Sequence, residues 1–196
     1  RCLGALSSSS LVGQAHHRFS YAEYLARERE TGLRHEFLDG QVFAMAGGTP
    51  EHARLIAEMT FALRQSLDPK RCRIFSADLR VRIPATGLAT YPDVAIVCGP
   101  VEVDDEDPNA VVNPSVLVEV LSPGTEAYDR GEKWAHYRRL ESLQAYVLVA
   151  PVAERLEAFV RTDAGFVSLV ATGDGPLALP AFGVELIPSE LFANAL

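Results

Sequence analysis

The run Val116-Leu117-Val118-Glu119-Val120-Leu121 decides the fold class, because it is typical of a buried β-strand and carries one carboxylate inside it. Ser122-Pro123-Gly124 ends the run. Side chains alternate along a strand, so Leu117, Glu119 and Leu121 are predicted to share a face. An ionised glutamate there carries a heavy desolvation cost unless a cation meets it. The alternative is a core carboxylate satisfied by an arginine or backbone donors; burial cost favours a functional Glu119.

A second carboxylate stands at the entrance of another apolar strand. Tyr91-Pro92-Asp93 leads into the run Val94-Ala95-Ile96-Val97. Taken alone, Asp93 reads equally well as a turn-forming aspartate. Two carboxylates on neighbouring core strands are costly as structure, whereas hard oxygen ligands in that arrangement suit Mg²⁺ or Mn²⁺. The pair Asp93 and Glu119 therefore predicts a divalent-metal site.

A helix predicted from about Glu126 to Leu140 supplies an amine for this site. Asp129, Lys133 and Tyr137 fall at i, i+4 and i+8 and form one stripe along it. A short loop joins the helix to the Glu119 strand, so the stripe is expected to face the carboxylates. Lys133 there would orient the attacking water and stabilise negative charge on phosphate. The alternative is an ordinary solvated helix lysine.

Two further residues are candidates for supporting roles, each with a structural alternative. His52 follows Thr49-Pro50-Glu51, which opens a helix, and it is either a cap residue or a group that contacts phosphate or relays a proton. Glu36 begins a hairpin and is either a surface carboxylate or an additional or indirect metal contact. For Asp78, the favoured interpretation is an ion pair with Arg80 or Arg82 on the same strand.

The remaining elements alternate between helices and strands. Ser20-Tyr21-Ala22-Glu23 is a capping box that opens a helix to about Glu30. Asp39-Gly40 predicts a type I′ hairpin turn within residues 37–43. Other predicted elements are a helix from residue 50 with an apolar face at Leu55, Ile56, Met59 and Leu63, one long strand over 72–83, and strands at 145–149, 156–161 and 166–170. The fold class is α/β (α+β), with a mixed central sheet flanked by helices.

Composition fits one globular domain. The chain has 196 residues, of which 48% are hydrophobic, and its mean hydropathy is +0.07. No apolar stretch approaches a membrane span. The net charge of −8 argues against a general nucleic-acid coat protein but does not exclude a nuclease. We assign residues 1–17 to a flexible leader or expression remnant and residues 18–196 to a single domain.

Cysteine usage gives an expectation about location. Three cysteines are an odd number, and Cys72 and Cys98 fall in strand-like segments. We predict that both are buried, reduced thiols. Reduced cysteines are typical of the cytoplasm, so a cytoplasmic protein is expected.

With these residues in place, the sequence resembles the PD-(D/E)XK nuclease superfamily, and within it the Uma-type family of putative restriction endonucleases. The resemblance covers about Ser20 to Leu191. Its text is His35-Glu36-Phe37-Leu38-Asp39-Gly40, His52, Tyr91-Pro92-Asp93-Val94, residues 118–125 beginning Val118-Glu119-Val120, Tyr128-Asp129-Arg130-Gly131-Glu132-Lys133, and Tyr137. It implies a restriction-endonuclease-like core, metal bound by Asp93, Glu119 and the Val120 carbonyl, and assistance from Glu36.

One departure from the superfamily pattern concerns the catalytic lysine. In the simplest pattern the lysine lies two residues after the acid, where this chain has Leu121. The two explanations are an inactive relic and migration of the amine to the following helix. We favour migration to Lys133, because it falls in the same stripe as Asp129.

These observations lead to two main functional hypotheses. The first is a Mg²⁺- or Mn²⁺-dependent endonuclease that hydrolyses DNA, with Asp93 and Glu119 as metal ligands and Lys133 as the migrated catalytic lysine. The second is a non-catalytic nuclease-fold module that binds nucleic acid or a protein partner. Hydrolysis of RNA or another phosphodiester is a weaker third possibility. We also expect a homodimer, built from the N-terminal helix or the C-terminal strands.

Overall fold

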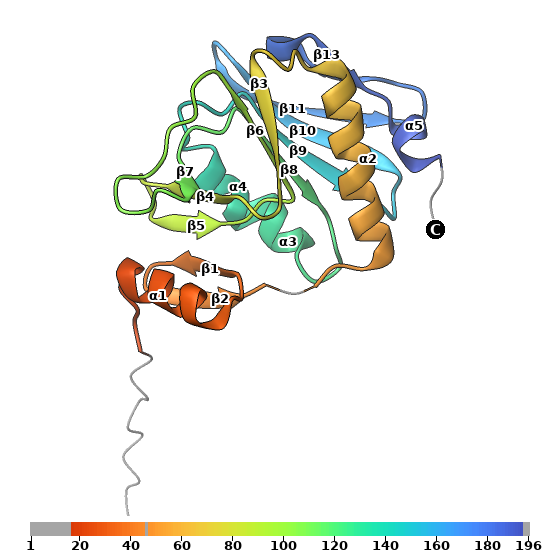
Figure 1. The fold of residues 1–196 in the computed structure, drawn as a ribbon. Helices are drawn as coiled ribbons and strands as arrows, with labels where there is room; N and C mark the ends of the chain where they lie inside the picture. The colour runs from red at the N-terminus through yellow and green to blue at the C-terminus, as the bar shows by residue number, and fades with distance from the viewer. Residues whose placement is uncertain (1–16, 46, 194–196) are drawn as a thin grey trace, which may run out of the picture.

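Two β-sheets flanked by helices form the scaffold of the computed structural model, which describes residues 17–45 and 47–193 (Figure 1). Of the segment assigned to a leader, residues 1–16 lie outside the described residues and only His17 lies within them. The larger sheet contains β3 (Cys72–Ser76), β6 (Val94–Cys98), β8 (Val116–Val120), β9 (Ala145–Ala150), β10 (Arg155–Thr162) and β11 (Gly165–Thr172). Its order is β11-β10-β9-β8-β6-β3, with β8 and β9 parallel and the other neighbours antiparallel. The predicted mixed sheet flanked by helices is confirmed.

The smaller sheet and the helices complete the described part of the chain. The smaller sheet has the order β2-β1-β5-β4-β7 and comprises β1 (His35–Leu38), β2 (Gln41–Ala44), β4 (Arg80–Ile83), β5 (Leu88–Thr90) and β7 (Ala110–Val111). A separate pair is β12 (Leu177–Leu179) with β13 (Val184–Leu186). The helices are α1 (Tyr21–Thr31), α2 (Pro50–Ser66), α3 (Glu126–Tyr128), the π-helix η1 (Asp129–Lys133), α4 (Trp134–Tyr137), the 3-10 helix η2 (Pro180–Phe182) and α5 (Pro188–Phe192). None of these helices is long and apolar enough to cross a bilayer.

The alternation of β8 sends its side chains into two separate cores. Val116, Val118 and Val120 pack in the core beneath α2, which lies across one face of the larger sheet (Figure 1). Leu117 and Leu121 pack in the opposite core with residues of α4 and the smaller sheet. Period-two alternation therefore places Glu119 on the second face, between the sheet and the helical segment that follows it.

Local sequence signals at the N-terminal half produce the predicted elements. The Ser20 side chain accepts a hydrogen bond from the Glu23 backbone N–H and completes a capping box at α1. Asp39 and Gly40 have φ of 48° and 77°, the positive values that a type I′ turn requires. Thr49 caps α2 by accepting from the His52 N–H, with Pro50 in the first turn. These local predictions are confirmed.

The prediction of one long strand over residues 72–83 is wrong. A turn follows Ser76, closed by a hydrogen bond from the Leu79 N–H to the Ser76 carbonyl, so β3 joins the larger sheet and β4 the smaller one. Asp78 lies in this turn and pairs with Arg34 rather than with Arg80 or Arg82.

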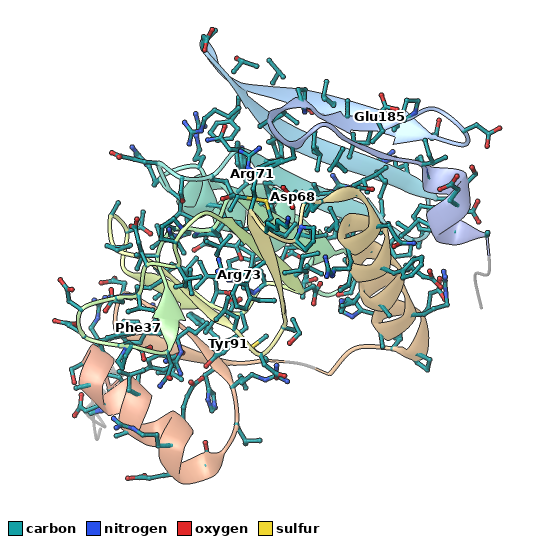
Figure 2. The ribbon with its side chains drawn as sticks, turned by 45° about the horizontal axis from the view of Figure 1, so that its top comes forward. Phe37, Asp68, Arg71, Arg73, Tyr91 and Glu185 are labelled. Carbon is teal, nitrogen blue, oxygen red and sulfur yellow. A yellow bond between two sulfur atoms is a disulfide. The ribbon has the colours of Figure 1, made fainter. Side chains whose placement is uncertain are left out.

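The arginines of residues 71–82 are consequently divided between two parts of the fold. Arg71 and Arg73 lie on the segment leading into and along β3 (Figure 2), whereas Arg80 and Arg82 lie on β4. Arg82 stacks over the Tyr21 ring at 4.0 Å.

The helix predicted over residues 126–140 is shorter and differently wound. It ends at Tyr137, and its centre is the π-helical turn from Asp129 to Lys133. π-helical turns are rare and occur frequently at functional sites. Backbone N–H groups of Arg139 and Leu140 donate to carbonyls three residues back, so the chain leaves the helix in a turn.

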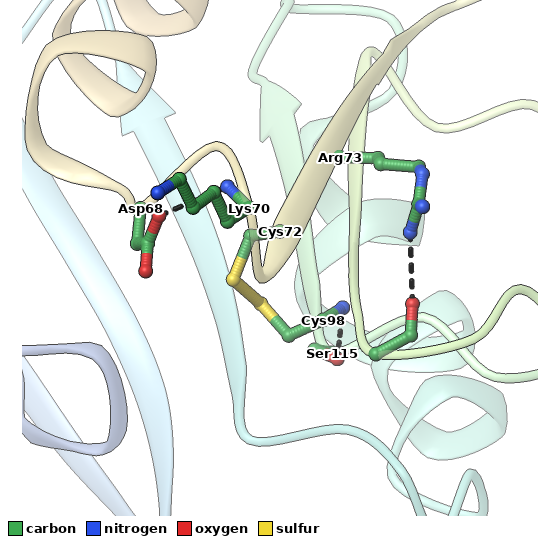
Figure 3. Close-up of a disulfide and its surroundings, with 7 residues drawn as sticks. Asp68, Lys70, Cys72, Arg73, Cys98 and Ser115 are labelled. Atoms are coloured by element: carbon green, nitrogen blue, oxygen red, sulfur yellow. Dashed lines mark hydrogen bonds between the residues drawn. A yellow bond between two sulfur atoms is a disulfide. The ribbon is translucent and has the colours of Figure 1, made fainter.

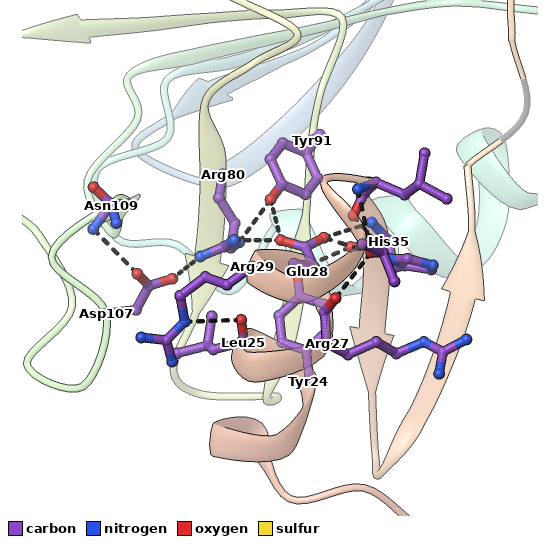
Figure 4. Close-up of polar contacts among 12 residues, drawn as sticks. Tyr24, Leu25, Arg27, Glu28, Arg29, His35, Arg80, Tyr91, Asp107 and Asn109 are labelled. Atoms are coloured by element: carbon purple, nitrogen blue, oxygen red, sulfur yellow. Dashed lines mark hydrogen bonds and ion pairs between the residues drawn. The ribbon is translucent and has the colours of Figure 1, made fainter.

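A buried ionic network joins the N-terminal helix to the smaller sheet and to the segment that precedes β6 (Figure 4). Arg80 of β4 pairs with the carboxylates of Glu28 and Asp107, and its Nε donates to the Tyr91 hydroxyl at 2.9 Å. The Tyr91 hydroxyl in turn donates to Glu28 at 2.6 Å. Tyr91 lies two residues before Asp93, so the network fixes the entrance of β6.

A disulfide between Cys72 and Cys98 contradicts the expectation of two reduced thiols (Figure 3). The two residues face each other directly in the antiparallel pair β3 and β6, which brings their side chains together. Sequence spacing alone gave no reason to pair them, because the pairing depends on strand register. The argument for a cytoplasmic location from reduced cysteines therefore loses its basis.

Reducing this disulfide is expected to lower the free energy of unfolding by about 2–4 kcal/mol, because the link closes a loop in the unfolded chain. Urea unfolding with and without a phosphine reductant measures the difference. The control is the Cys72→Ser/Cys98→Ser double variant, whose midpoint should not respond to reductant. Equal midpoints for the wild type in both conditions would contradict the prediction.

Candidate functional site

Asp93 and Glu119 meet where β6 and β8 lie side by side. Val94 pairs with Val118 in the antiparallel register, so Asp93 stands opposite Glu119. The Val120 N–H donates to Asp93 Oδ2 at 2.8 Å, and Glu119 Oε2 lies 3.4 Å from the Asp93 backbone nitrogen. The two carboxylates thus open into the same space, on the face that the strand alternation predicted.

Lys133 lies at the centre of a group of carboxylates. Its Nζ is 2.9 Å from Glu119 Oε1, 3.2 Å from Asp129 Oδ1 and 3.4 Å from Glu36 Oε1. The side chain is only 7% exposed, so this ammonium is paired inside the protein. Neighbouring Trp134 does not contact the carboxylates in this way; its ring stacks on those of Phe159 and Tyr146. The placement agrees with the expectation for a migrated lysine; its catalytic role remains a prediction.

Tyr137 fixes the same oxygen of Glu119 that Lys133 contacts. The Tyr137 hydroxyl donates to Glu119 Oε1 at 2.8 Å. Burial, together with the Glu119 charge, raises the pKa of the Tyr137 hydroxyl well above its ordinary value, so it remains a donor. With Oε1 held twice, Glu119 Oε2 is the oxygen directed toward Asp93.

His52 closes the opposite side of this group. Its Nε2 lies 3.4 Å from Asp93 Oδ2. The hydrogen bond to Asp93 raises the pKa of the His52 imidazole. A Cβ at Gly48 would lie 2.7 Å from His52 Nδ1, so any other residue at position 48 would force the imidazole to shift. The sequence predicted that His52 lies at the helix start, but not that its ring contacts Asp93.

Glu36 and Asp129 complete the set of candidate residues. Glu36, on β1, accepts a hydrogen bond from Thr90, and its Oε1 lies 3.4 Å from Lys133 Nζ. Burial and the nearby Glu36 raise the pKa of the Tyr128 hydroxyl. Asp129 begins the π-helical turn, and its backbone carbonyl accepts from the Tyr146 hydroxyl at 3.0 Å. All the sequence-predicted site residues are therefore brought together.

Sequence reasoning missed three polar residues of the site: Thr90, Tyr128 and Tyr146. Tyr128 lies next to Asp129 in the quoted helix text, and its ring is 5.6 Å from Lys133 Nζ, a contact at i and i+5 that a π-helical turn permits. Thr90 and Tyr146 lie on apolar strands and carried no local signal.

The site has more negative than positive charge. Four carboxylates, those of Glu36, Asp93, Glu119 and Asp129, gather around Lys133 and His52. Burial, with Asp93 and Asp129 nearby, raises the pKa of Glu119 to about 8 despite Lys133. Burial alone would lower the pKa of Lys133, but the surrounding carboxylates hold it well above its ordinary value. The excess negative charge calls for a proton or a further cation.

These residues line a cavity of about 440 Å³. Its floor is charged, and its rim is apolar: Phe43 is 46% exposed, Met45 37% and Val152 97%. Lys133 and His52 are the cationic side chains in the lining described for this cavity. The arrangement is a polar, acid-rich floor under an apolar mouth.

The donor set fits a hard divalent cation. Among residues 17–45 and 47–193, no group of three or more His, Cys, Asp and Glu side chains is arranged to hold a metal ion. Mg²⁺, however, binds through one or two carboxylates and keeps several waters. Asp93, Glu119 and the Val120 carbonyl are oxygen donors of that kind, in a site short of positive charge.

Known proteins share this fold and sequence. A crystal structure described as a putative nuclease belonging to DUF820, from Anabaena variabilis, matches with a TM-score of 0.73 and 18% identity, over 89% of this chain and 98% of that one, which shows a common α+β fold. Residues 21–190 match the model of the Uma2 family, described as "Putative restriction endonuclease", so the chain belongs to that family. Two relatives from Synechocystis sp. (strain ATCC 27184 / PCC 6803 / Kazusa) are named as uncharacterized proteins. They are slr1290, 36% identical over 76% of this chain and 77% of its own length, and sll1609, 32% identical over 69% and 77%.

Proposed function

We propose that the chain is a PD-(D/E)XK-type endodeoxyribonuclease that uses Mg²⁺ or Mn²⁺. The observation that carries the proposal is the meeting of Asp93 and Glu119, from adjacent strands, with Lys133 inside one acid-rich cavity. Membership of a family described as "Putative restriction endonuclease" supports the choice of DNA as substrate.

Asp93, Glu119 and the Val120 carbonyl would hold the cation. When bound, a divalent cation polarises the scissile phosphate and lowers the pKa of a coordinated water. Lys133 and Tyr137 orient Glu119 by holding Oε1, which leaves Oε2 for the cation. The Lys133 ammonium, kept protonated by the carboxylates around it, places positive charge beside the phosphate oxygens as they gain negative charge.

Cleavage assays test this function directly. Wild-type protein should cut plasmid, linear or single-stranded DNA in Mg²⁺ or Mn²⁺, and not in a chelator. Asp93→Asn and Glu119→Gln should lose cleavage, whereas Glu185→Gln makes the same charge change on β13, far from Tyr91 at the cavity (Figure 2), and should retain it. Equal cleavage by all four proteins would reject the proposed site.

A non-catalytic nuclease-fold module is the second candidate, and the contacts of His52 favour it. The His52 ring already pairs with Asp93, with Nε2 3.4 Å from Oδ2, so one of the two proposed carboxylate ligands has a partner without a metal. Titration with Mn²⁺ separates the two functions. Binding that Asp93→Asn abolishes supports the enzyme; absence of binding to the wild type supports the module.

Action on cellular DNA implies a cytoplasmic protein, and we propose that location. The Cys72–Cys98 disulfide gives a direct test, because cytoplasmic thiols are generally kept reduced. Alkylation of intact cells followed by mass analysis should find free thiols at both positions. A fully oxidised pair in vivo would place the protein in an oxidising compartment.

Affinity for Mg²⁺ is expected to rise with pH. The increase should be about tenfold per pH unit from roughly pH 6, and the affinity should become constant above the Glu119 pKa of about 8. Binding must displace the Glu119 proton, which burial retains. In the metal-free protein, the raised pKa means that protonated Glu119 stabilises the fold. This contribution to the free energy of unfolding is complete below pH 4.5 and is lost as the pH rises through about 8. Added Mg²⁺ should therefore raise the melting temperature more at about pH 8.5 than at about pH 6.5.

Glu119→Gln and Glu185→Gln provide the matched comparison for this pH dependence. Glu119→Gln should show no Mg²⁺-induced shift at either pH, and Glu185→Gln should behave as the wild type. A Mg²⁺-induced shift of wild-type size in Glu119→Gln would mean that the cation binds elsewhere.

A further inference from the structure

β11 is an edge strand that carries no charged residue and no proline, and it packs against α5 and β12. It is the last strand of the larger sheet, and its eight residues, Gly-Phe-Val-Ser-Leu-Val-Ala-Thr over 165–172, carry no charge. Val167 is 44% exposed and Val170 is 62% exposed. Natural edges are generally blunted by charges, prolines, bulges or covering segments, because an open edge pairs with other chains. A charge-free edge with exposed valines is typical of an interaction surface.

The register shows which peptide groups of β11 are available for pairing. The Arg161 N–H donates to the Gln144 carbonyl, on the β9 side of β10. Odd-numbered residues of β10 therefore face β9, and even-numbered residues face β11. Since Val160 pairs with Val167, the odd-numbered residues of β11 bond to β10. The N–H and C=O groups of Phe166, Ser168 and Val170 consequently point outward from the sheet.

This outward edge is complementary to itself. If two β11 strands run antiparallel about a two-fold axis at Ser168, three residues on each copy exchange both backbone hydrogen bonds with the partner. Phe166 then stands opposite Val170 of the partner subunit, and Val167 opposite Leu169 of the partner subunit. Aromatic and β-branched pairs of this kind stabilise sheets. No charged residue lies in the paired segments to oppose this arrangement.

Contacts within the same chain fix the position of the Phe166 ring. Its ring packs edge-on against Trp134 at 4.9 Å, and the Arg161 guanidinium lies 4.5 Å above it. The opposite end of the sheet differs, because the short edge strand β3 carries Arg73 and the disulfide. Self-pairing is therefore favoured at the β11 edge.

We propose that β11 is the dimerisation strand, through which two copies of the chain join their larger sheets into one continuous sheet. The contact lies three strands away from β8 and does not touch Asp93, Glu119 or Lys133. The inference is consequently independent of the proposed nuclease function, and each can fail without the other.

Light scattering of the full chain, coupled to gel filtration at about 10 μM, measures this assembly. The wild type should have twice the 21.3 kDa mass of one chain. Val170→Lys should be a monomer, because two lysines would face the partner's apolar residues. Val101→Lys, at a valine that is 38% exposed outside the strands, should remain a dimer. A monomeric wild type, or a dimeric and folded Val170→Lys, would overturn the proposal.

Ser168→Pro tests the pairing without adding charge and covers the case in which Val170→Lys fails to fold. The Ser168 N–H points outward, so proline removes no hydrogen bond from the folded monomer. It should remove two bonds from the dimer and raise its dissociation constant at least tenfold. An unchanged dissociation constant would reject pairing through this edge.

Cross-linking tests the register. In a Cys2→Ser background, Ser168→Cys places two thiols at the two-fold axis, and mild oxidation should give a covalent dimer. Thr172→Cys, four residues from the axis, should give none. A Thr172→Cys dimer without a Ser168→Cys dimer would exclude the proposed register.

Discussion

Replacing Lys133 with methionine is expected to lower turnover about 10²–10³-fold and to change DNA affinity little. Methionine keeps the length of the side chain but removes the charge that faces Glu119, Asp129 and Glu36. That charge acts mainly in the transition state, where negative charge builds on phosphate. Single-turnover cleavage and fluorescence anisotropy measure the two quantities separately.

Lys70 offers a matched control for this variant, because it is the only other lysine in the chain and is exposed. Lys70→Met should cleave at the wild-type rate. Lys133→Met should still bind Mn²⁺, since the ammonium is not a ligand. Wild-type cleavage by Lys133→Met would remove support for the migrated lysine and favour the relic hypothesis.

The sequence predicted the centre of the fold because burial leaves a clear pattern in it. The apolar runs around Asp93 and Glu119 form neighbouring strands, and alternation put Glu119 on the face that the following helix covers. The spacing of Asp129 and Lys133 predicted that the lysine side chain faces the carboxylates, although this part of the helix is a π-helix. At these positions, local periodicity and tertiary packing agree.

The errors arose where distant segments decide the local structure. The alternating polarity of residues 72–83 continues through the turn at Asp78, so periodicity could not show that β3 and β4 enter different sheets. The Cys72–Cys98 link depends on the register of β3 against β6, which no spacing encodes. The resemblance implied the Val120 carbonyl as a ligand, but only coordinates show that the Val120 amide holds Asp93.

Arg80 is the clearest example of a residue whose role depends on segments distant in the sequence. The sequence favoured an ion pair between Asp78 and Arg80 or Arg82 on one strand. In the structure Arg80 is 11% exposed and neutralises Glu28 and Asp107, from segments far away in the sequence. Its guanidinium also lies 5.4 Å from the ring centres of Tyr24 and Tyr91. This arginine is therefore a structural residue of the fold.

Replacing Arg80 with methionine is expected to lower the free energy of unfolding by about 3–5 kcal/mol. The loss leaves the carboxylates of Glu28 and Asp107, 7% and 3% exposed, without their cation. A domain of this kind is stable by only about 5–15 kcal/mol, so the loss is a large fraction of the total. Urea unfolding measures it, with Arg73→Met, an exposed arginine with one hydrogen bond to the Gly99 carbonyl, as the control.

The unpaired charge, rather than lost packing, should account for most of this effect. Neutralising both acids as well, in Arg80→Met/Glu28→Gln/Asp107→Asn, should therefore recover much of the stability, because amides cost less to bury than carboxylates. A loss for Arg80→Met no larger than that for Arg73→Met would contradict the prediction. Because Tyr91 bonds both Arg80 and Glu28 and precedes Pro92-Asp93, Arg80→Met should also weaken the binding of Mn²⁺ at Asp93. The stability of the N-terminal network and the position of the metal ligand are in this way expected to change together.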